Sequence, residues 1–275
     1  MRDCWRVGTF EFDRSKQPVE LKVEYSAYAG QTTLGKVLME SFSNLRASLK
    51  PKSGWFDFSS EELCFLEGDL PPLERIEGLL KLLSECISVC DDCDMSHCLD
   101  VYRTPLETVE SPEDWPKTQV GRLVSKAKYG SDYVSARALG GRLLDFVRQH
   151  PALATADAVC SVPASSDHGN RLDLPGVWAP LVAEEMRIPV LSLHRTRYTK
   201  VQKGFEDREQ RRQNQRGSML AGEGAERKRV LVLDDLYTEG DTMTEAARAL
   251  REAGADRVFG LCSVKTAKGA RGLNF

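Results

Sequence analysis

The sequence predicts an α/β protein built from two parts, and three observations support this prediction. Four apolar residues, Val230 to Leu233, precede the helix-forming segment Thr244 to Ala253, which is the order of a buried strand followed by a helix. In the first half, polar and apolar residues alternate over Val19 to Tyr28, as is typical of a half-exposed strand. Between the halves, residues 104–118 are rich in proline and acidic residues, which predicts a linker.

The remaining elements follow from the spacing of apolar residues. In the first half we expect a β-like segment over Cys4 to Asp13, amphipathic helices over Thr33 to Leu49 and Leu73 to Val89, and a short strand over Trp55 to Phe58. In the second half, apolar residues recur at helical spacing after Gly130, and a final strand is expected over Arg257 to Val264. The predicted organisation is an N-terminal α/β module over residues 1–103, the linker over 104–118 and a C-terminal domain over 119–275.

Composition excludes a membrane-spanning protein, and the two halves of the chain carry net charges of opposite sign. No apolar run approaches the ~20 residues that a membrane span needs, and the N-terminus lacks the apolar core of a signal peptide, so we expect a cytoplasmic protein. Residues 1–118 hold 13 Lys/Arg against 22 Asp/Glu, whereas residues 119–275 hold 25 against 19. Most of the positive excess lies in residues 187–216, a stretch suited to binding a polyanion, with a solvated helix face as the alternative.

Two adjacent acids, Asp234 and Asp235, directly follow the predicted strand Val230 to Leu233. Acids at the carboxyl end of such a strand lie where open α/β sheets bind ligands, and carboxylates accept hydrogen bonds from sugar hydroxyls and hold Mg²⁺. A Thr/Gly loop and a helix come next, and backbone N–H groups at a helix N-terminus attract an anion. The order of these features predicts a site for a phosphorylated sugar.

The segment Val230 to Met243 resembles the phosphoribosyl pyrophosphate (PRPP) motif of type I phosphoribosyltransferases, in which an apolar strand and two acids precede Thr-Thr-Gly-x-Thr. Glu239 stands here where the family has its second Thr. The resemblance implies a mainly parallel sheet with helices on both faces, and it makes Asp234 and Asp235 the catalytic pair that holds the ribose hydroxyls and Mg²⁺. It also implies that a loop binds the 5′-phosphate, namely Thr238, Glu239, Gly240, Asp241 and Thr242.

Other segments resemble the ComF-like branch of that family, which is linked to competence and DNA uptake. They are Lys126 to Gly130, Asp157 to Ala164, Leu193 to Gln202 and Arg211 to Asn214. The resemblance implies a pyrophosphate loop formed by Val162, Pro163, Ala164 and Ser165 with help from Arg171 or Lys128. It further implies a flexible loop that carries Arg208, Arg211 and Arg212. Where the branch usually has Arg-Gly-Phe-Asn, this chain has Asn170 to Asp173.

The resemblance implies an enzyme of nucleotide metabolism that uses PRPP with Mg²⁺. A nitrogenous base or an amine would displace pyrophosphate, and the sequence does not identify this acceptor. The alternative is a non-catalytic module that senses PRPP or a nucleotide, or one that associates with nucleic acid. A third alternative is an effector that depends on a partner protein. Family members commonly form homodimers.

Four of the eight cysteines form a cluster with the spacing Cys86-x3-Cys90-x2-Cys93-x4-Cys98. Four thiolates this close in sequence are sufficient for a structural, tetrahedral Zn²⁺, and the ComF-like branch often carries an N-terminal cysteine zinc site. Its usual arrangement of two Cys-x-x-Cys pairs is absent here. Reduced thiols without metal and a redox or iron–sulfur role are the alternatives.

Overall fold

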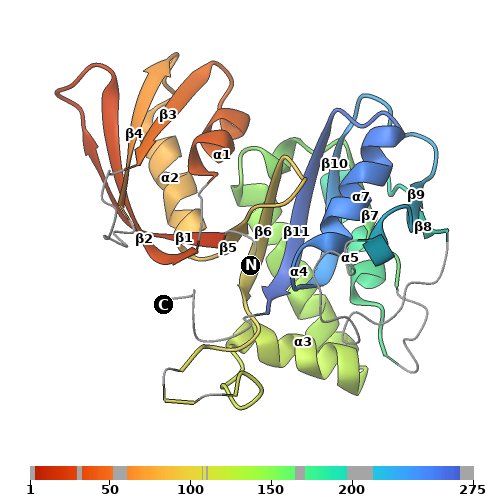
Figure 1. The fold of residues 1–275 in the computed structure, drawn as a ribbon. Helices are drawn as coiled ribbons and strands as arrows, with labels where there is room; N and C mark the ends of the chain where they lie inside the picture. Colours follow the sequence, from red (N-terminus) through yellow and green to blue (C-terminus); the bar gives the residue numbers. More distant parts are fainter. Residues whose placement is uncertain are drawn as a thin grey trace.

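Nine strands form one continuous sheet within the part of the chain that the computed structural model describes, which comprises residues 4–29, 33–51, 61–106, 108, 109, 111–164, 171–196 and 213–266. The strand order is β3-β4-β2-β1-β5-β6-β11-β10-β7 (Figure 1). The antiparallel half consists of β1 (Cys4–Asp13), β2 (Val19–Ala29), β3 (Leu45–Pro51), β4 (Glu61–Gly68) and β5 (Ile87–Val89). The parallel half consists of β6 (Met95–Val101), β7 (Ala158–Ser161), β10 (Arg229–Tyr237) and β11 (Arg257–Lys265).

Helices cover both faces of the parallel half (Figure 1). Leu231 and Leu233 of β10 share a core with the helices α3 (Gln119–Gly130), α4 (Tyr133–Gln149) and α5 (Leu174–Met186). Val230 and Val232, which alternate with them along the strand, pack instead under α7 (Asp241–Glu252). The mainly parallel sheet with helices on both faces, predicted for the C-terminal domain, is therefore confirmed for β6, β11, β10 and β7.

The N-terminal module packs the helices α1 (Leu34–Ser41) and α2 (Leu73–Ser84) against its antiparallel strands, so its predicted α/β class is confirmed (Figure 1). The prediction of one helix over Thr33 to Leu49 is wrong, because α1 ends at Ser41 and β3 begins at Leu45. Asn44 has a φ of 69° in the turn between them, and this left-handed conformation breaks the helix and directs the chain into the sheet. The second predicted helix likewise ends at Ser84, and β5 occupies its last residues. The expected strand over Trp55 to Phe58 lies outside the described residues.

The strand β6 joins the two halves, because it pairs antiparallel with β5 and parallel with β11. A strand from the first 103 residues thus belongs to the sheet of the C-terminal part. The segment expected to be a linker folds back on itself, since the N–H of Thr104 donates to the carbonyl of Pro116 and fully buried Trp115 donates from Nε1 to the carbonyl of Val109. The division into a module over residues 1–103, a linker over 104–118 and a domain over 119–275 stays a prediction.

Two smaller elements lie outside this sheet. The strands β8 (Leu193–Arg195) and β9 (Met219–Ala221) form an antiparallel pair beside α7, and a 3₁₀ turn spans Leu153–Thr155. Across the described residues, no helix has the length and apolar character that would allow it to span a bilayer.

Candidate functional site

The acid pair lies on the part of β10 that extends beyond its neighbour β7. The last β7 residue, Ser161, is paired with Leu233, and the N–H of Val162 donates to the carbonyl of Leu233 at 2.9 Å. From Asp234 to Tyr237, the strand pairs only with β11 among the described strands. The acids therefore lie at the carboxyl end of the sheet, next to the end of β7, which is where open α/β sheets form ligand crevices.

Asp234 and Asp235 are successive strand residues, so their side chains point to opposite faces of the sheet. On the face of α3, the Nζ of Lys128 lies 2.5 Å from Oδ2 of Asp235. On the face of α7, the charge of Arg195 acts on Asp234. The two acids are thus balanced by two cations, one on each face of the sheet.

The pKa values reflect this arrangement. Burial, followed by repulsion from Asp235, raises the pKa of Asp234 to about 7, although Lys128 and Arg195 oppose the shift. Burial lowers the pKa of Lys128, but the attraction of Asp235 and then of Asp234 outweighs it and leaves that pKa raised. The Lys128 and Asp235 side chains are only 14% and 10% exposed, so their ion pair is poorly screened by water.

Arg195 is a site residue that the sequence analysis did not single out. Its Nε lies 3.2 Å from the carbonyl oxygens of both Pro163 and Ala164, and its Nη1 lies 3.4 Å from Oε1 of Gln215. The side chain thereby links the loop after β7 to the segment before β9. In the sequence, Arg195 lies within the segment Leu193 to Gln202 that resembles the ComF-like branch, but no role was assigned to this residue.

The predicted phosphate loop forms the turn between β10 and α7. Gly240 has a φ of 80°, a left-handed conformation that glycine adopts without steric cost, and its carbonyl accepts a hydrogen bond from the N–H of Thr244 at 2.9 Å. Thr238, Glu239 and Thr242 are half-buried in this turn. Asp241 is the first residue of α7 and is only 4% exposed, so a carboxylate lies at the positive end of the helix.

The structure also brings together residues predicted to bind pyrophosphate. The N–H of Leu172 donates to the carbonyl of Lys128 at 3.3 Å, and the guanidinium of Arg171 lies 5.2 Å from the centre of the Tyr129 ring. Arg171 therefore lies beside the end of α3 that carries Lys128. Four further predicted residues lie outside the described residues, namely Ser165, Arg208, Arg211 and Arg212.

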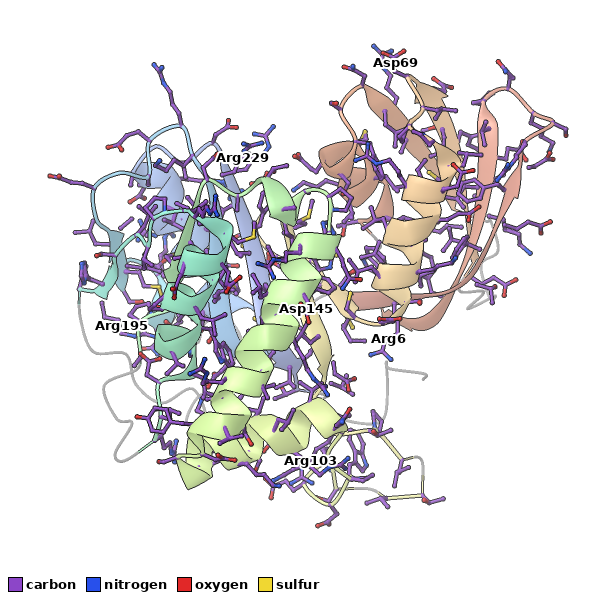
Figure 2. The ribbon with its side chains drawn as sticks, turned by 180° about the vertical axis from the view of Figure 1, so that it is seen from behind. Arg6, Asp69, Arg103, Asp145, Arg195 and Arg229 are labelled. Carbon is purple, nitrogen blue, oxygen red and sulfur yellow. The ribbon has the colours of Figure 1, made fainter. Side chains whose placement is uncertain are left out.

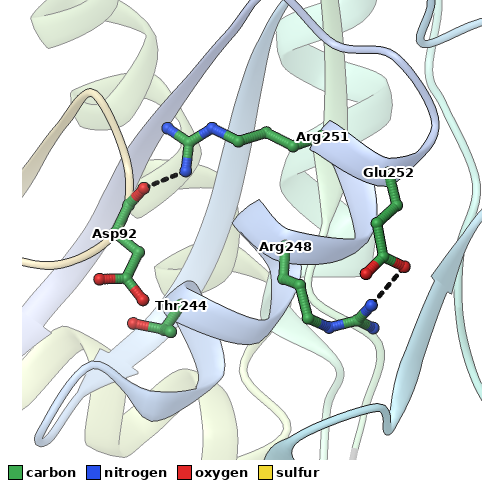
Figure 3. A pocket seen from close by; sticks show the side chains of 5 residues that line it. All are labelled: Asp92, Thr244, Arg248, Arg251 and Glu252. Carbon is green, nitrogen blue, oxygen red and sulfur yellow. Dashed lines mark hydrogen bonds and ion pairs between the residues drawn. The ribbon is translucent and has the colours of Figure 1, made fainter.

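A groove runs along the outer face of α7, and Figure 3 shows one of its two hollows. Neither acid of the pair lines it, but Asp241 of the predicted phosphate loop lines the second hollow. Two hollows of about 470 and 480 Å³ share Asp92, Thr244 and Arg248. Arg248 is bound by Glu245 and Glu252 of its own helix, and Arg251 binds the carbonyl of Asp92. Because Arg248 and Arg251 are already engaged by protein oxygens, this groove offers a weaker anion site than the helix N-terminus beside Gly240.

The structure does not gather the four clustered cysteines. Cys86 and Cys90 pack with the core on the α4 face, whereas Cys93 and Cys98 belong to the core under α7. Burial raises the pKa of Cys86 to about 12, which favours the protonated thiol over the thiolate that binds metal. Among the described residues, no group of three or more His, Cys, Asp or Glu side chains is arranged to hold a metal ion. The predicted zinc ligands do not fit zinc here, and we derive no role for that metal.

No protein-family model and no curated protein match the chain. Solved structures similar to it include phosphoribosylpyrophosphate synthetase from Mycobacterium smegmatis, with 20% identity over 46% of this chain and 33% of that one and a TM-score of 0.31. Orotate phosphoribosyltransferase from Aeropyrum pernix has 22% identity over 51% and 64% of the two chains, with a TM-score of 0.33. Glutamine PRPP amidotransferase from B. subtilis has 19% identity over 88% and 46%, with a TM-score of 0.34.

The chain spans less than two thirds of the length of each of these three proteins. Likenesses at these TM-scores indicate neither the substrate nor the reaction of this protein. Evidence for its chemistry comes from the residues of the site.

Proposed function

We propose that this protein binds PRPP and transfers its phosphoribosyl group to a nitrogenous base or an amine. The observation that carries the proposal is the acid pair on β10, which has one cation on each face and leads directly into a left-handed glycine turn and a helix N-terminus. This arrangement offers hydrogen-bond acceptors for sugar hydroxyls beside donors for a phosphate. The motif resemblance of Val230 to Met243 supports the same ligand.

The proposed roles follow from position. Asp234 and Asp235 accept hydrogen bonds from the ribose hydroxyls, and the backbone N–H groups of residues 238–242 receive the 5′-phosphate. The segment Val162 to Ala164 receives the pyrophosphate, with positive charge supplied by Lys128 and Arg171. Carboxylate oxygens are the hard donors that Mg²⁺ prefers, so the acid pair fits this ion, which would neutralise the charge of the pyrophosphate.

In the proposed reaction, the bond between the anomeric carbon and the pyrophosphate oxygen breaks, and a bond from that carbon to the acceptor nitrogen forms. The acceptor nitrogen loses a proton to the solvent, and pyrophosphate leaves with the bonding electron pair. The protein contributes by positioning the two reactants and by placing Lys128 and Arg171 where negative charge develops on the leaving group.

A second candidate function is PRPP sensing without transfer. Two observations favour it. The Nζ of Lys128 lies 2.5 Å from Oδ2 of Asp235, and Glu239 adds a carboxylate to the phosphate loop. Both features place groups of the protein itself where substrate groups would bind. Release of pyrophosphate distinguishes transfer from sensing.

The test is calorimetric titration of PRPP with and without Mg²⁺. We expect Mg²⁺-dependent binding in the wild type and its loss in the double variant Asp234→Asn/Asp235→Asn. Asp145→Asn is the matched control, since it makes the same chemical change on an exposed residue of α4 (Figure 2). Absence of binding at millimolar PRPP overturns the proposal.

A panel of bases and amines then tests transfer. Pyrophosphate release with one of them supports the enzyme, and PRPP binding without release supports sensing. Nucleic-acid binding that depends steeply on salt and survives the double substitution would instead support the nucleic-acid-associated alternative.

A further inference from the structure

We propose that Arg195 is a positioning residue, which holds the loop after β7 in the conformation that binds the pyrophosphate group. This inference rests on the proposed function, because it assigns a cause to the pyrophosphate affinity of that site. Arg195 acts through the loop and is not assigned a contact with the substrate.

The guanidinium of Arg195 is anchored to two consecutive loop carbonyls. Its Nε lies 3.2 Å from the oxygens of Pro163 and Ala164, the two residues that follow Val162. Its Nη1 reaches Gln215, which is only 4% exposed. Burial lowers the pKa of Arg195, and the charges of Asp234 and Glu245 oppose this shift, so the cation lies between the loop and two carboxylates.

The backbone of Arg195 is itself held in place. Arg195 ends β8 and pairs with Met219 of β9, whose N–H donates to Oε1 of Glu245 at 3.0 Å. Arg248, one turn along α7, binds both oxygens of that carboxylate at 2.8 and 2.9 Å. The β8–β9 pair is therefore held against α7. Arg195 extends from this pair and holds the loop after β7 in a fixed position relative to α7.

Peptide geometry explains why the two carbonyls matter. In a trans peptide, the C=O of Pro163 and the N–H of Ala164 point in opposite directions. A carbonyl of Pro163 that faces Arg195 therefore turns the N–H of Ala164 away from Arg195, where it remains available as a donor. Because Pro163 has no N–H, backbone hydrogen bonds can hold this residue only through its carbonyl oxygen. Without Arg195, these negatively polarised oxygens are free to turn toward a bound pyrophosphate and repel it.

The substitution Arg195→Lys tests this role, because it keeps the charge but removes the planar fork of donors. We expect the affinities for pyrophosphate and PRPP to fall about 10- to 100-fold, as expected for lost hydrogen bonds to a charged group. The affinity for ribose 5-phosphate should stay within about twofold of the wild type, because residues 238–242 bind it. Arg195→Gln, which also removes the charge, should show the larger loss for pyrophosphate.

The control is Arg229→Lys, which makes the same change in a paired arginine at the first residue of β10, at the opposite end of the strand from the acids (Figure 2). Arg229 binds both carboxylate oxygens of Asp157 at 3.0 Å, so the control also disrupts a fork-like pair. Its affinities for all three ligands should match the wild type. Ribose 5-phosphate binding also reports whether each variant is folded.

The outcomes separate this inference from the proposed function. A selective loss of pyrophosphate and PRPP affinity in the Arg195 variants supports the positioning role. Unchanged affinities overturn it, and an equal loss for all three ligands also overturns it, because it shows a purely structural role. If the wild type binds neither pyrophosphate nor PRPP, the proposed function fails and this inference fails with it.

Discussion

Replacing Asp234 with Asn should stabilise the ligand-free protein at neutral and alkaline pH while abolishing Mg²⁺-dependent PRPP binding. The ionised form of Asp234 is disfavoured in the folded state by burial and by the charge of Asp235. Asn resembles the protonated acid in shape, and its side-chain oxygen retains an acceptor for the N–H of Asp235, which lies 2.8 Å from Oδ1 in the wild type. The substitution therefore removes a charge without removing this hydrogen bond.

The size of the effect follows from the pKa. The pKa of Asp234 rises from 3.8 to about 7 on folding. Each unit corresponds to roughly 1.4 kcal/mol, so ionisation costs on the order of 4 kcal/mol of stability once the carboxyl is fully charged. Because the folded state binds this proton more tightly than the unfolded state does, the contribution of Asp234 to stability is highest below pH 3.8 and falls as pH rises toward 7. The advantage of Asp234→Asn should therefore be small near pH 4 and reach its full value by pH 8.

Urea denaturation of the wild type and Asp234→Asn at pH 4.5, 6 and 8 measures this difference. Other groups that titrate on folding are common to both proteins and largely cancel in the comparison. A variant that is no more stable than the wild type at pH 8, or a difference that does not change with pH, would refute the reasoning. Asp145→Asn again serves as the control, and its stability should differ from the wild type by less than about 0.5 kcal/mol at each pH.

Two further predictions concern buried charge and buried histidine. Lys128→Met should destabilise the protein by roughly 3–5 kcal/mol at pH 8, since it leaves Asp235 buried without its cation; urea denaturation should show that adding Asp235→Asn recovers most of this loss, and no recovery would contradict the ion-pair account. His97 is 1% exposed and packs on His150 with their ring centres 4.9 Å apart, and burial lowers the pKa of His97 to about 3. Its stabilising contribution is complete above pH 6.5 and declines as pH falls toward 3, so His97→Gln should reduce the loss of stability between pH 7 and 4.5 by about 2–3 kcal/mol; an equally steep loss in the variant would exclude this cause.

The sequence predicted the parts of the site that are formed by neighbouring residues. The strand Val230 to Leu233, the acids after it, the turn at Gly240 and the helix α7 follow one another in the chain, and each has its own local signal. Local order was sufficient for these features because their geometry depends on few residues outside the segment.

The cations were harder to predict, because tertiary packing places them. Lys128 was expected beside the pyrophosphate, but the packing of α3 brings its ammonium onto Asp235. Arg195 reaches the loop after β7 only because β8 pairs with β9 and β9 is attached to α7. Similarly, nothing in the sequence of Met95 to Val101 indicated that this strand pairs with β11, because that pairing joins residues more than 150 positions apart.

The two cations neutralise the acid pair from opposite sides of β10. Lys128 and Arg195 approach the acid pair from opposite faces of one strand, so a displacement of Lys128 need not displace Arg195. Binding of PRPP with Mg²⁺ would supply new partners for the carboxylates and would release Lys128 toward the negatively charged pyrophosphate. Arg195 is already engaged by the loop and has no such freedom. In the proposed function, the two cations would therefore differ, because Lys128 beside α3 would move on binding whereas Arg195 beside α7 would stay in place.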